Sequence, residues 1–370
     1  MPPLSQPQAP VWWVAVALLG LITGSFLNAV IHRLPRGISL LNPRRSFCPS
    51  CGKSIPWHEN LPLVSWILLR GRCAGCAAPI GVRYLLVEFL TAALYCTVWW
   101  RFGLPLAPVF WIFVSLLVAA TFIDFDHLII PDEVTLGGTV AGLLCAAFFP
   151  SLLGQDAWWL GFCWSLAGAA GGYFLLWGVV ELGKKAFGKR MFRFEEGETL
   201  EIADGVAGLE LVLGEHRTVL AEFFHRETDR IEAVCEGLEI DGEFRPQGCL
   251  SIGPGSLVHE GGEWLLAELA DAMPVRARVS EVVIPREAMG FGDVKFLACI
   301  GAFLGWQGVL FSLFAGSVIG AVIGVLCMAA TRGRSGGRIP FGPYLALGAL
   351  IWMLAGPELV DAYFRRMHGG

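Results

Sequence analysis

The chain has 370 residues, of which 55% are hydrophobic and 16% are charged, and it includes 14 Trp and 25 Phe. Soluble domains average about 45–50% apolar and about 25% charged residues, so this composition excludes an ordinary soluble protein and indicates a membrane protein. A nucleic-acid partner is not expected, because the positive charges flank apolar runs and do not line one face.

Charge is distributed unevenly along the chain. Residues 191–285 carry 20 acidic and 7 basic side chains, a net charge of −13. By subtraction from the 32 acidic and 27 basic residues of the whole chain, the remainder carries 12 acidic and 20 basic side chains, or +8. The formal net charge of −5 therefore hides an acidic segment inside a basic, apolar chain.

Apolar runs predict the membrane part of the fold. A helix needs about 20 apolar residues to cross the hydrocarbon core. Six runs approach this length, at residues 11–32, 84–100, 105–123, 134–153, 158–181 and 309–330. Two shorter runs, 294–305 and 340–355, can span the membrane if they are tilted or extended. We therefore expect an all-α polytopic membrane protein with about eight transmembrane helices.

The first apolar run is predicted to be a retained helix and not a signal peptide. No basic residue precedes Val11, and the charges of this segment follow the apolar stretch, which is the reverse of a signal peptide.

The distribution of basic residues predicts the orientation in the membrane. Between Arg33 and Arg83 the chain has eight basic residues against one acidic residue, Glu59. The positive-inside rule places this loop in the cytoplasm. Eight alternating crossings then place 124–133, 182–293 and 331–339 on the same side.

The cytoplasmic loop contains a pattern typical of a metal site. Four of the eleven cysteines form two Cys-x-x-Cys pairs with 21 residues between them: Cys48, Cys51, Cys73 and Cys76. Two such pairs at this spacing are typical of one tetrahedral zinc site with four thiolate ligands. We expect Gly52 and Gly75 to ease the two turns. Two disulfides are the competing interpretation, which a reducing cytoplasm disfavours. Four thiolates leave no open position, so the zinc is expected to be structural.

Two aspartates are predicted to meet at the cytoplasmic face. Asp124 ends the third apolar run, and Asp293 lies just before the run 294–305. Charged residues at the edge of the hydrocarbon are costly and by default mark function. Two carboxylates brought close cannot both ionise, so one holds a proton while the other can activate a water that attacks a peptide carbonyl. The sequence therefore predicts an aspartic peptidase dyad.

Neighbouring residues are candidates for active-site support. Gly290 and Gly292 lack a Cβ and let the backbone approach the site. Lys295 either anchors to lipid phosphate, the interpretation we favour, or tunes the dyad. Asp132 follows Pro131 and is interpreted as the N-cap of the next helix. Asp126 faces away from the preceding aspartate by about 200° on a helix, so Asp124 is favoured as the catalytic residue.

Five motifs occur in a recognisable order. They are Gly24-Ser-Phe-Leu-Asn28 with His32-Arg-Leu-Pro35, the two cysteine pairs, Asp124-x-Asp-…-Pro131-Asp132, Arg286-Glu-Ala-Met-Gly-Phe-Gly-Asp-Val-Lys295 and Pro340-Phe-Gly-Pro-Tyr-Leu-Ala-Leu-Gly348. Together they resemble the bacterial type IV prepilin leader peptidase family, which also serves type II secretion pseudopilins. The resemblance extends over residues 11–183 and 284–355.

The resemblance implies two activities in the bacterial inner membrane. One is cleavage after a Gly at the end of a short basic leader by Asp124 and Asp293, on the cytoplasmic face. The other is methylation of the new N-terminal residue, usually Phe, with S-adenosylmethionine as methyl donor. The family associates the methyltransferase with the N-terminal cytoplasmic loop, where no glycine-rich nucleotide fingerprint is visible. Prepilins, pseudopilins and membrane lipid are the implied partners.

These expectations divide the chain into five regions. They are the first transmembrane helix in 1–35, the zinc-binding loop in 36–83, helices two to five with the first catalytic Asp in 84–183, an acidic insert in 184–285, and helices six to eight with the second catalytic Asp in 286–370.

The insert departs from the family, whose members connect these helices by a short loop. Alternating runs at Thr199–Ile202 and Leu209–Leu213 predict a small β-rich cytosolic domain, with a helix near Glu263–Ala272. Its acidity can attract a basic partner, although a solvated surface is the favoured interpretation. A Cys235–Cys249 disulfide is disfavoured in the cytosol. His216, His225 and His259 are too dispersed for a metal site.

Three other functions are alternatives to this pair of activities. The closest variant is a peptidase without methyltransferase activity. A membrane scaffold that recruits pilus or secretion components through the acidic insert is the alternative from another class. A transporter is disfavoured, because transport calls for polar groups near the bilayer midplane, whereas the ionisable residues here gather at one face, with Glu88 the exception.

Overall fold

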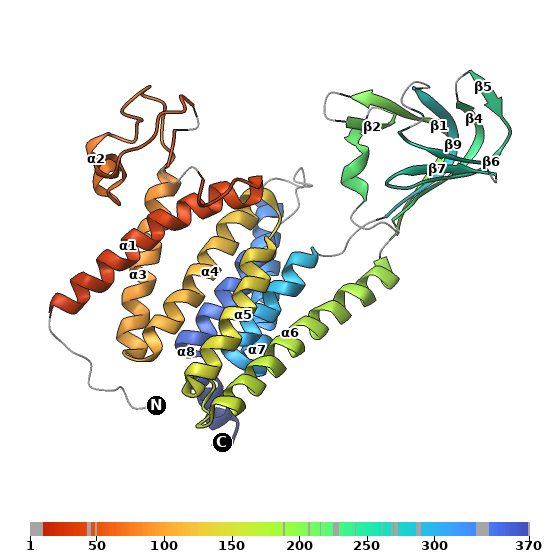
Figure 1. Ribbon diagram of the computed structural model, residues 1–370. Coiled ribbons are helices and arrows are strands. Elements are labelled where there is room, and N and C mark those ends of the chain that lie inside the picture. The colour runs from red at the N-terminus through yellow and green to blue at the C-terminus, as the bar shows by residue number, and fades with distance from the viewer. Residues whose placement is uncertain are drawn as a thin grey trace. The chain divides into compact units, whose positions relative to one another are not determined.

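The computed structural model describes residues 10–42, 46–48, 50–187, 189–205, 208–214, 216–224, 229–240, 242–260, 262–267, 269, 273–285, 290–330 and 340–368. The chain forms two compact units, which are described separately (Figure 1). Unit 1 comprises Met1–Trp177 and Gly290–Gly370, and unit 2 comprises Gly178–Met289. Three features named above, His225, the loop 331–339 and the first four residues of the 286–295 motif, lie outside the described residues.

Unit 1 is helical. In chain order its helices are α1 (Pro10–Arg33), α2 (Val64–Leu68), α3 (Val82–Phe102), α4 (Leu106–His127), α5 (Asp132–Phe148), α6 (Trp158–Phe187, which continues into unit 2), α7 (Phe291–Ala330) and α8 (Gly342–His368). Six of these, all except α2 and α5, are long and apolar enough to cross a membrane. The expected helical polytopic membrane character is thereby confirmed, and the number of spans stays a prediction, because α5 has 17 residues and α7 is bent.

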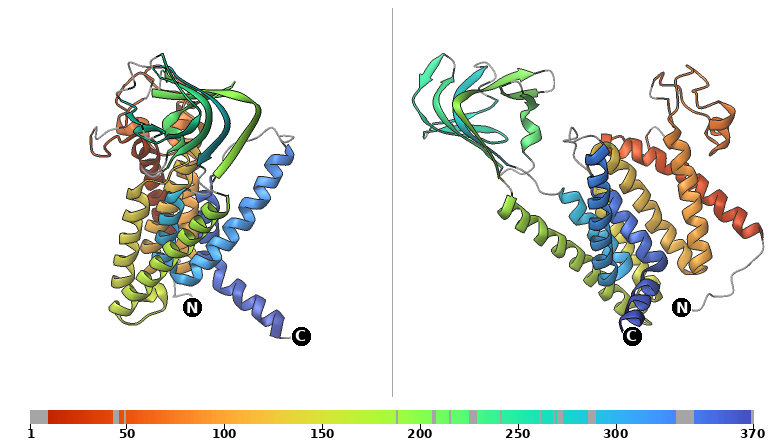
Figure 2. Two further views of the ribbon diagram at one scale, coloured as in Figure 1. Left: turned by 90° about the vertical axis from the view of Figure 1, so that its right-hand side faces the viewer. Right: turned by 180° about the vertical axis from the view of Figure 1, so that it is seen from behind.

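Helix α7 consists of two limbs that meet at Gly305, where φ is 68° and ψ is −177°. Beyond the bend, a Cβ on Gly308 would touch Trp352, and a Cβ on Gly316 would touch the Tyr344 backbone. The second limb is therefore antiparallel to α8 and returns to the end of unit 1 where α8 begins (Figure 2). The sequence predicted these limbs as the separate runs 294–305 and 309–330.

Small residues allow the helices to approach closely, as is common in membranes. On α1, a Cβ added to Gly20 or Gly24 would lie 2.6 Å from the Cα of a residue on α3, Ala92 or Glu88 respectively. On α6, a Cβ on Gly168 would lie 2.3 Å from the carbonyl oxygen of Gly301 in α7. The α1–α3 contacts bring together the ends of these two helices that are predicted to face the cytoplasm. The α6 contact holds α6 against the first limb of α7.

The described residues of unit 2 form a nine-stranded antiparallel sheet that curls in Figure 2. Its strands are β1 (Lys189–Gly205), β2 (Gly208–Leu213), β3 (His216–Val219), β4 (Ile231–Ile240), β5 (Glu243–Arg245), β6 (Gly248–Ile252), β7 (Ser256–His259), β8 (Gly262–Leu265) and β9 (Val275–Pro285). Their order is β3-β2-β1-β9-β4-β6-β7-β8, with β5 paired to β4. A core that includes Leu200, Ile231 and Leu250 fills the inner face.

The expected β-rich insert is thus confirmed, and one detail was wrong. Runs 199–202 and 209–213 lie in β1 and β2. A helix was expected near 263–272, but the start of this segment is not helical. Gly262–Leu265 forms strand β8, which pairs with β7, for example Trp264 with Leu257. Sheet pairing overrides the helix propensity of this segment. Residues 268 and 270–272 lie outside the described residues.

Many acidic side chains of unit 2 are paired with arginines. Glutamate–arginine ion pairs join neighbouring strands at Glu201–Arg276, Glu281–Arg193 and Glu236–Arg278. This pattern favours the interpretation of a solvated, salt-bridged surface. Cys235 and Cys249 are both free thiols, and the buried Cys235 thiol donates to the Gly248 carbonyl (3.1 Å), so they form no disulfide.

Candidate functional site

Asp124 lies in the last turn of α4 with its side chain buried, 5% exposed. Helix α4 continues to His127, three residues beyond Asp124, and ends at Leu128 in a left-handed conformation. The backbone N–H of Gly342, the first residue of α8, donates to Asp124 Oδ2 at 2.9 Å. The carboxylate is therefore oriented by a backbone donor from a segment 218 residues away.

Asp293 lies in the first turn of α7 and is 8% exposed. Its backbone N–H donates to the carbonyl of Gly290 at 3.2 Å, which forms a turn at the start of the helix. Within the described residues, its Oδ1 atom is buried and has no hydrogen-bond partner. A buried polar atom without a partner is costly in a structural role, so this oxygen is available for a substrate or a water.

The two aspartates meet at one end of unit 1. Ile130, in the connection between α4 and α5, packs between them: a Cβ on Gly342 would lie 2.9 Å from Ile130 Cδ1, and one on Gly292 would lie 3.2 Å from Ile130 N. The helix ends that carry Asp124 and Asp293 therefore lie against the same residue. The chain thus brings together two acidic groups that are far apart in sequence.

Asp126 points to a different partner. It forms an ion pair with Arg83 at the start of α3, and the same guanidinium donates to the carbonyl of Phe122 at 3.0 Å. The Arg83 guanidinium also lies over the Phe122 ring. Asp126 therefore joins α3 to the end of α4 and is held away from the pair of buried carboxylates.

Asp132 and Lys295 form an ion pair, with Lys295 Nζ 2.6 Å from Asp132 Oδ1. This corrects the interpretation of Asp132 as an N-cap: Asp132 is the first residue of α5, Pro131 occupies the cap position, and no side chain caps the helix. It also gives Lys295 a protein partner in place of a lipid phosphate. The pair joins the first turns of α5 and α7 beside Asp293.

Sequence reasoning missed three contributors to this site. Gly342 belongs to a motif noted above without a role, Ile130 was not singled out, and Arg83 served only to predict orientation. The signal for Gly342 was a glycine directly before Pro343 at the start of an apolar run. Nothing in the sequence alone pairs it with a carboxylate on another helix.

The four predicted cysteines form one cluster in the loop between α1 and α3. Their Sγ atoms lie within 4.8 Å of one another, and those of Cys48 and Cys76 are 3.8 Å apart. Thiolates in a tetrahedral zinc site, with Zn–S bonds of about 2.3 Å, are about 3.8 Å apart. Cys48 is buried, Cys73 is half-buried and the other two are exposed. The cluster is therefore suited to hold a tetrahedral metal ion.

Each cysteine pair forms a similar turn. The N–H of Cys48 donates to the Lys53 carbonyl, and the N–H of Cys73 donates to the Ala78 carbonyl, both at 2.9 Å. The residue after each second cysteine has a positive φ, 70° at Gly52 and 56° at Ala77. The expectation for Gly52 fits this geometry, whereas in the second turn Ala77, and not Gly75, adopts the left-handed conformation.

Hydrogen bonds to the thiols also favour a bound cation. Backbone N–H groups of Cys51 and Ser50 lower the pKa of Cys48 to about 6. The pKa of Cys76 is raised to about 11: the Ala78 N–H lowers it, but Cys51, burial and the other thiols outweigh that effect. Four thiols so close cannot all ionise without a positive charge between them. A divalent metal ion would supply that charge.

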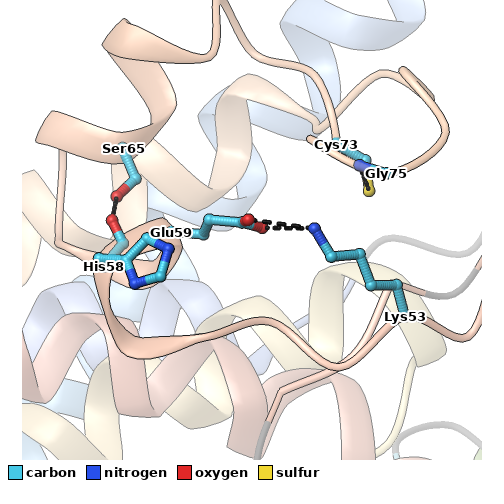
Figure 3. Close-up of polar contacts among 6 residues, drawn as sticks. All are labelled: Lys53, His58, Glu59, Ser65, Cys73 and Gly75. Atoms are coloured by element: carbon cyan, nitrogen blue, oxygen red, sulfur yellow. Dashed lines mark hydrogen bonds and ion pairs between the residues drawn. The ribbon is translucent and has the colours of Figure 1, made fainter.

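Side-chain contacts stiffen the loop around the cluster (Figure 3). Lys53 Nζ lies 3.0 Å from Glu59 Oε1, which ties the first cysteine turn to the segment before α2. The Ser65 hydroxyl donates to the His58 carbonyl at 3.0 Å. The N–H of Gly75 donates to Cys73 Sγ at 3.4 Å.

Comparison with known proteins defines the class of this site. The chain matches the model of the bacterial peptidase A24 N-terminal domain over residues 18–102 and that of the type IV leader peptidase family over residues 111–192 and 263–325. The chain belongs to the type IV leader peptidase family. The first match contains the four cysteines, and the two parts of the second contain Asp124 and Asp293 respectively. Residues 193–262, within unit 2, lie outside the matches.

Similar curated proteins carry the name prepilin leader peptidase/N-methyltransferase. One from Myxococcus xanthus is 33% identical over 89% of this chain and 67% of its own length. Those from Pseudomonas aeruginosa and Stutzerimonas stutzeri are 30% and 29% identical, over 94% and 96% of this chain and 92% and 95% of their own lengths. No solved structure matches the chain.

Proposed function

We propose that this chain is a bifunctional membrane enzyme, which cleaves the leader from prepilins and type II secretion pseudopilins and then N-methylates the new N-terminal residue. The observation that carries the peptidase assignment is the pair of buried carboxylates, Asp124 at the end of α4 and Asp293 at the start of α7. Membership of the type IV leader peptidase family and the names of the relatives support the substrate class and the second activity.

In the proposed mechanism the two aspartates divide the proton transfers. The Gly342 N–H stabilises charge on Asp124, so Asp124 is the ionised base that takes a proton from the attacking water. Asp293, whose buried Oδ1 has no hydrogen-bond donor to stabilise a charge within the described residues, holds a proton and donates it to the scissile carbonyl oxygen. When the tetrahedral intermediate collapses, the C–N bond breaks, the leaving amine receives the proton that Asp124 took, and one hydroxyl of the intermediate returns its proton to Asp293 as the carbonyl re-forms. Mature protein and leader carboxylate are the products.

The active site is proposed to face the cytoplasm of the bacterial inner membrane. Basic side chains gather in the loop at the end of unit 1 where α3 begins and α4 ends, among them Arg36, Lys53 and Arg72. The positive-inside rule assigns such an end to the cytoplasm. A basic leader presented at this face would reach Asp124 and Asp293 without crossing the membrane.

The cysteine cluster is proposed to hold a structural zinc ion. Its donor set is four thiolates, which leaves no coordination position for a substrate or water. The zinc would neutralise the thiolates and fix the loop between α1 and α3. S-adenosylmethionine is the proposed methyl donor, because the relatives are named as N-methyltransferases.

The experiment that tests this function uses purified full-length protein in detergent with a synthetic prepilin that carries a basic leader ending in Gly-Phe. Mass spectrometry is expected to find the leader removed after Gly, and the mature product heavier by one methyl group only when S-adenosylmethionine is present. A protein that leaves every prepilin and pseudopilin of its own bacterium intact, although correctly folded, would instead favour a scaffold.

Substitution of Gly342 by Ala is expected to slow prepilin cleavage by roughly 10- to 100-fold, because small displacements of catalytic groups have effects of this size. A Cβ at this position would lie 2.7 Å from Asp124 Oδ2 and 2.9 Å from Ile130 Cδ1. The carboxylate must therefore move, and its bond from the Gly342 N–H lengthens. The measurement is single-turnover cleavage of saturating prepilin.

Gly137→Ala is the matched control for this substitution. Gly137 lies in α5, and a Cβ there would meet no atom within 4 Å. Cleavage by the control is expected to equal that of the wild type. Equal cleavage by the Gly342 variant would show that Gly342 does not orient Asp124 during catalysis.

A further inference from the structure

A cavity of about 470 Å³ lies between α1 and the cysteine loop. From α1 it is lined by Ser25, Ala29 and Arg33, which follow one face of the helix. From the loop it is lined by Asn60 and Pro62, in the segment before α2. The proposed peptidase mechanism uses none of these residues. Sites for small organic ligands commonly have volumes of about 300–1,000 Å³, so the cavity is large enough for one.

The two walls of the cavity are joined by a buried carboxylate. Glu88 of α3 is 8% exposed, and its Oε2 accepts the Leu63 N–H at 2.8 Å on the loop side. The same carboxylate accepts a hydrogen bond from Ser25 on the α1 side. Leu63 has a φ of 59°, a conformation that residues with a Cβ rarely adopt. Glu88 thus holds the loop in an otherwise unfavourable conformation against α1.

Further contacts fix the loop wall. The Ser65 hydroxyl donates to the His58 carbonyl (Figure 3). It also accepts the Leu61 N–H at 2.9 Å, so the backbone closes around Ser65. On the other wall, Arg33 donates to the carbonyls of Ser39 and Leu40 at 3.3 and 3.4 Å. The cavity is therefore preformed, with a guanidinium held at its border.

We propose that this cavity binds S-adenosylmethionine, an inference that rests on the proposed methyltransferase activity. The positive charge of the Arg33 guanidinium at the border of the cavity suits the ligand's α-carboxylate. Ser25 and Asn60 provide hydrogen-bonding groups for the ribose and adenine, and the ring of Phe26, which also lines the cavity, provides an apolar face for adenine.

The cavity lies in the part of the chain that matches the N-terminal domain of the family. For the transfer itself, the lone pair of the neutral N-terminal amine attacks the methyl carbon. The methyl–sulfur bond breaks with its electron pair left on sulfur, which yields S-adenosylhomocysteine. The protonated methylamine then releases one proton to water. No further reactant is required.

The test is equilibrium binding of radiolabelled S-adenosylmethionine to purified full-length protein. Ala29→Trp fills the cavity from α1 and is expected to weaken binding at least ~10-fold, because an indole takes the ligand's space. Asn60→Trp fills the cavity from the exposed loop wall. It is expected to weaken S-adenosylmethionine binding by the same factor without changing how the transmembrane helices pack. The matched controls are Ala15→Trp on α1 and Asn42→Trp in the loop, neither of which lines the cavity.

Leader cleavage by the same samples separates the possible outcomes. Wild-type cleavage and methylation together with unimpaired ligand binding by both cavity variants would overturn the cavity assignment and leave the proposed function standing. A wild type that neither cleaves nor methylates would overturn both. If native mass spectrometry finds a phospholipid that only the cavity variants lose, while their S-adenosylmethionine binding is unchanged, the cavity is a lipid site and the inference is wrong.

Discussion

Replacement of Asp124 or Asp293 by Asn is expected to reduce prepilin cleavage by at least ~10³-fold, because each substitution removes one partner of a shared proton transfer. Asn keeps the size of the side chain, and its carbonyl can still accept the Gly342 N–H at position 124. Loss of activity would therefore reflect proton transfer and not collapse of the site. The measurement is conversion of a synthetic prepilin under single-turnover conditions, followed by mass spectrometry.

The double substitution sharpens this test. If the two aspartates act as one unit, the Asp124→Asn/Asp293→Asn variant should be no slower than either single variant, because groups that act together have non-additive effects. Methylation of a pre-cleaved pilin peptide is expected to be unchanged in all three variants, which would show that the protein is folded.

Asp126→Asn and Asp132→Asn are the matched controls. Their carboxylates pair with Arg83 and Lys295, respectively, and not with the buried aspartates. Exposed ion pairs contribute about 0–1 kcal/mol, so each control is expected to keep cleavage within ~10-fold of wild type. Cleavage lost in Asp126→Asn but kept in Asp124→Asn would exchange the roles of these two residues. Cleavage that survives Asp293→Asn would refute the dyad.

Depth in the membrane is the reason that the first catalytic candidate could be chosen from sequence. Asp124 and Asp126 are two residues apart, and only the one nearer the apolar run was expected to face the interior. In the structure Asp124 is buried and Asp126 pairs with Arg83. Depth and helix periodicity were sufficient to predict which side chain is buried, because both residues belong to one helix, α4. The catalytic role of Asp124 stays a prediction.

Contacts between helices were beyond sequence reasoning. Asp132 was expected to cap α5, but its oxygen pairs with Lys295, which lies 163 residues away. Gly342 likewise serves Asp124 from another helix. A local pattern reports what a residue can do within its own helix, whereas these roles depend on which helix ends lie side by side. For the same reason the strand at Trp264 was mistaken for helix, since pairing with β7 decides it.

Replacement of Cys48 by Ser is expected to lower the zinc content of the purified protein from about one ion per chain to below ~0.1, because loss of one ligand opens a four-thiolate structural site. Cys48 is the buried member of the cluster, and its Sγ lies 3.8 Å from that of Cys76. Plasma mass spectrometry of the metal-dialysed protein measures the content. Cys163→Ser, at an exposed cysteine of α6, is the matched control and should keep the ion.

Loss of the zinc ion is expected to reduce methylation much more than leader cleavage. The described part of the loop buries few side chains besides Cys48 and Ser65, so its fold depends on the metal, whose binding supplies roughly 10–16 kcal/mol in small zinc domains. Without zinc, the wall formed by Asn60 and Pro62 loses its support, and methylation is expected to fall at least ~10-fold, as for other disrupted binding sites. Cleavage should change much less, because Asp124 is oriented by α8 and not by the loop. Equal loss of both activities would mean that the loop also forms part of the peptidase site.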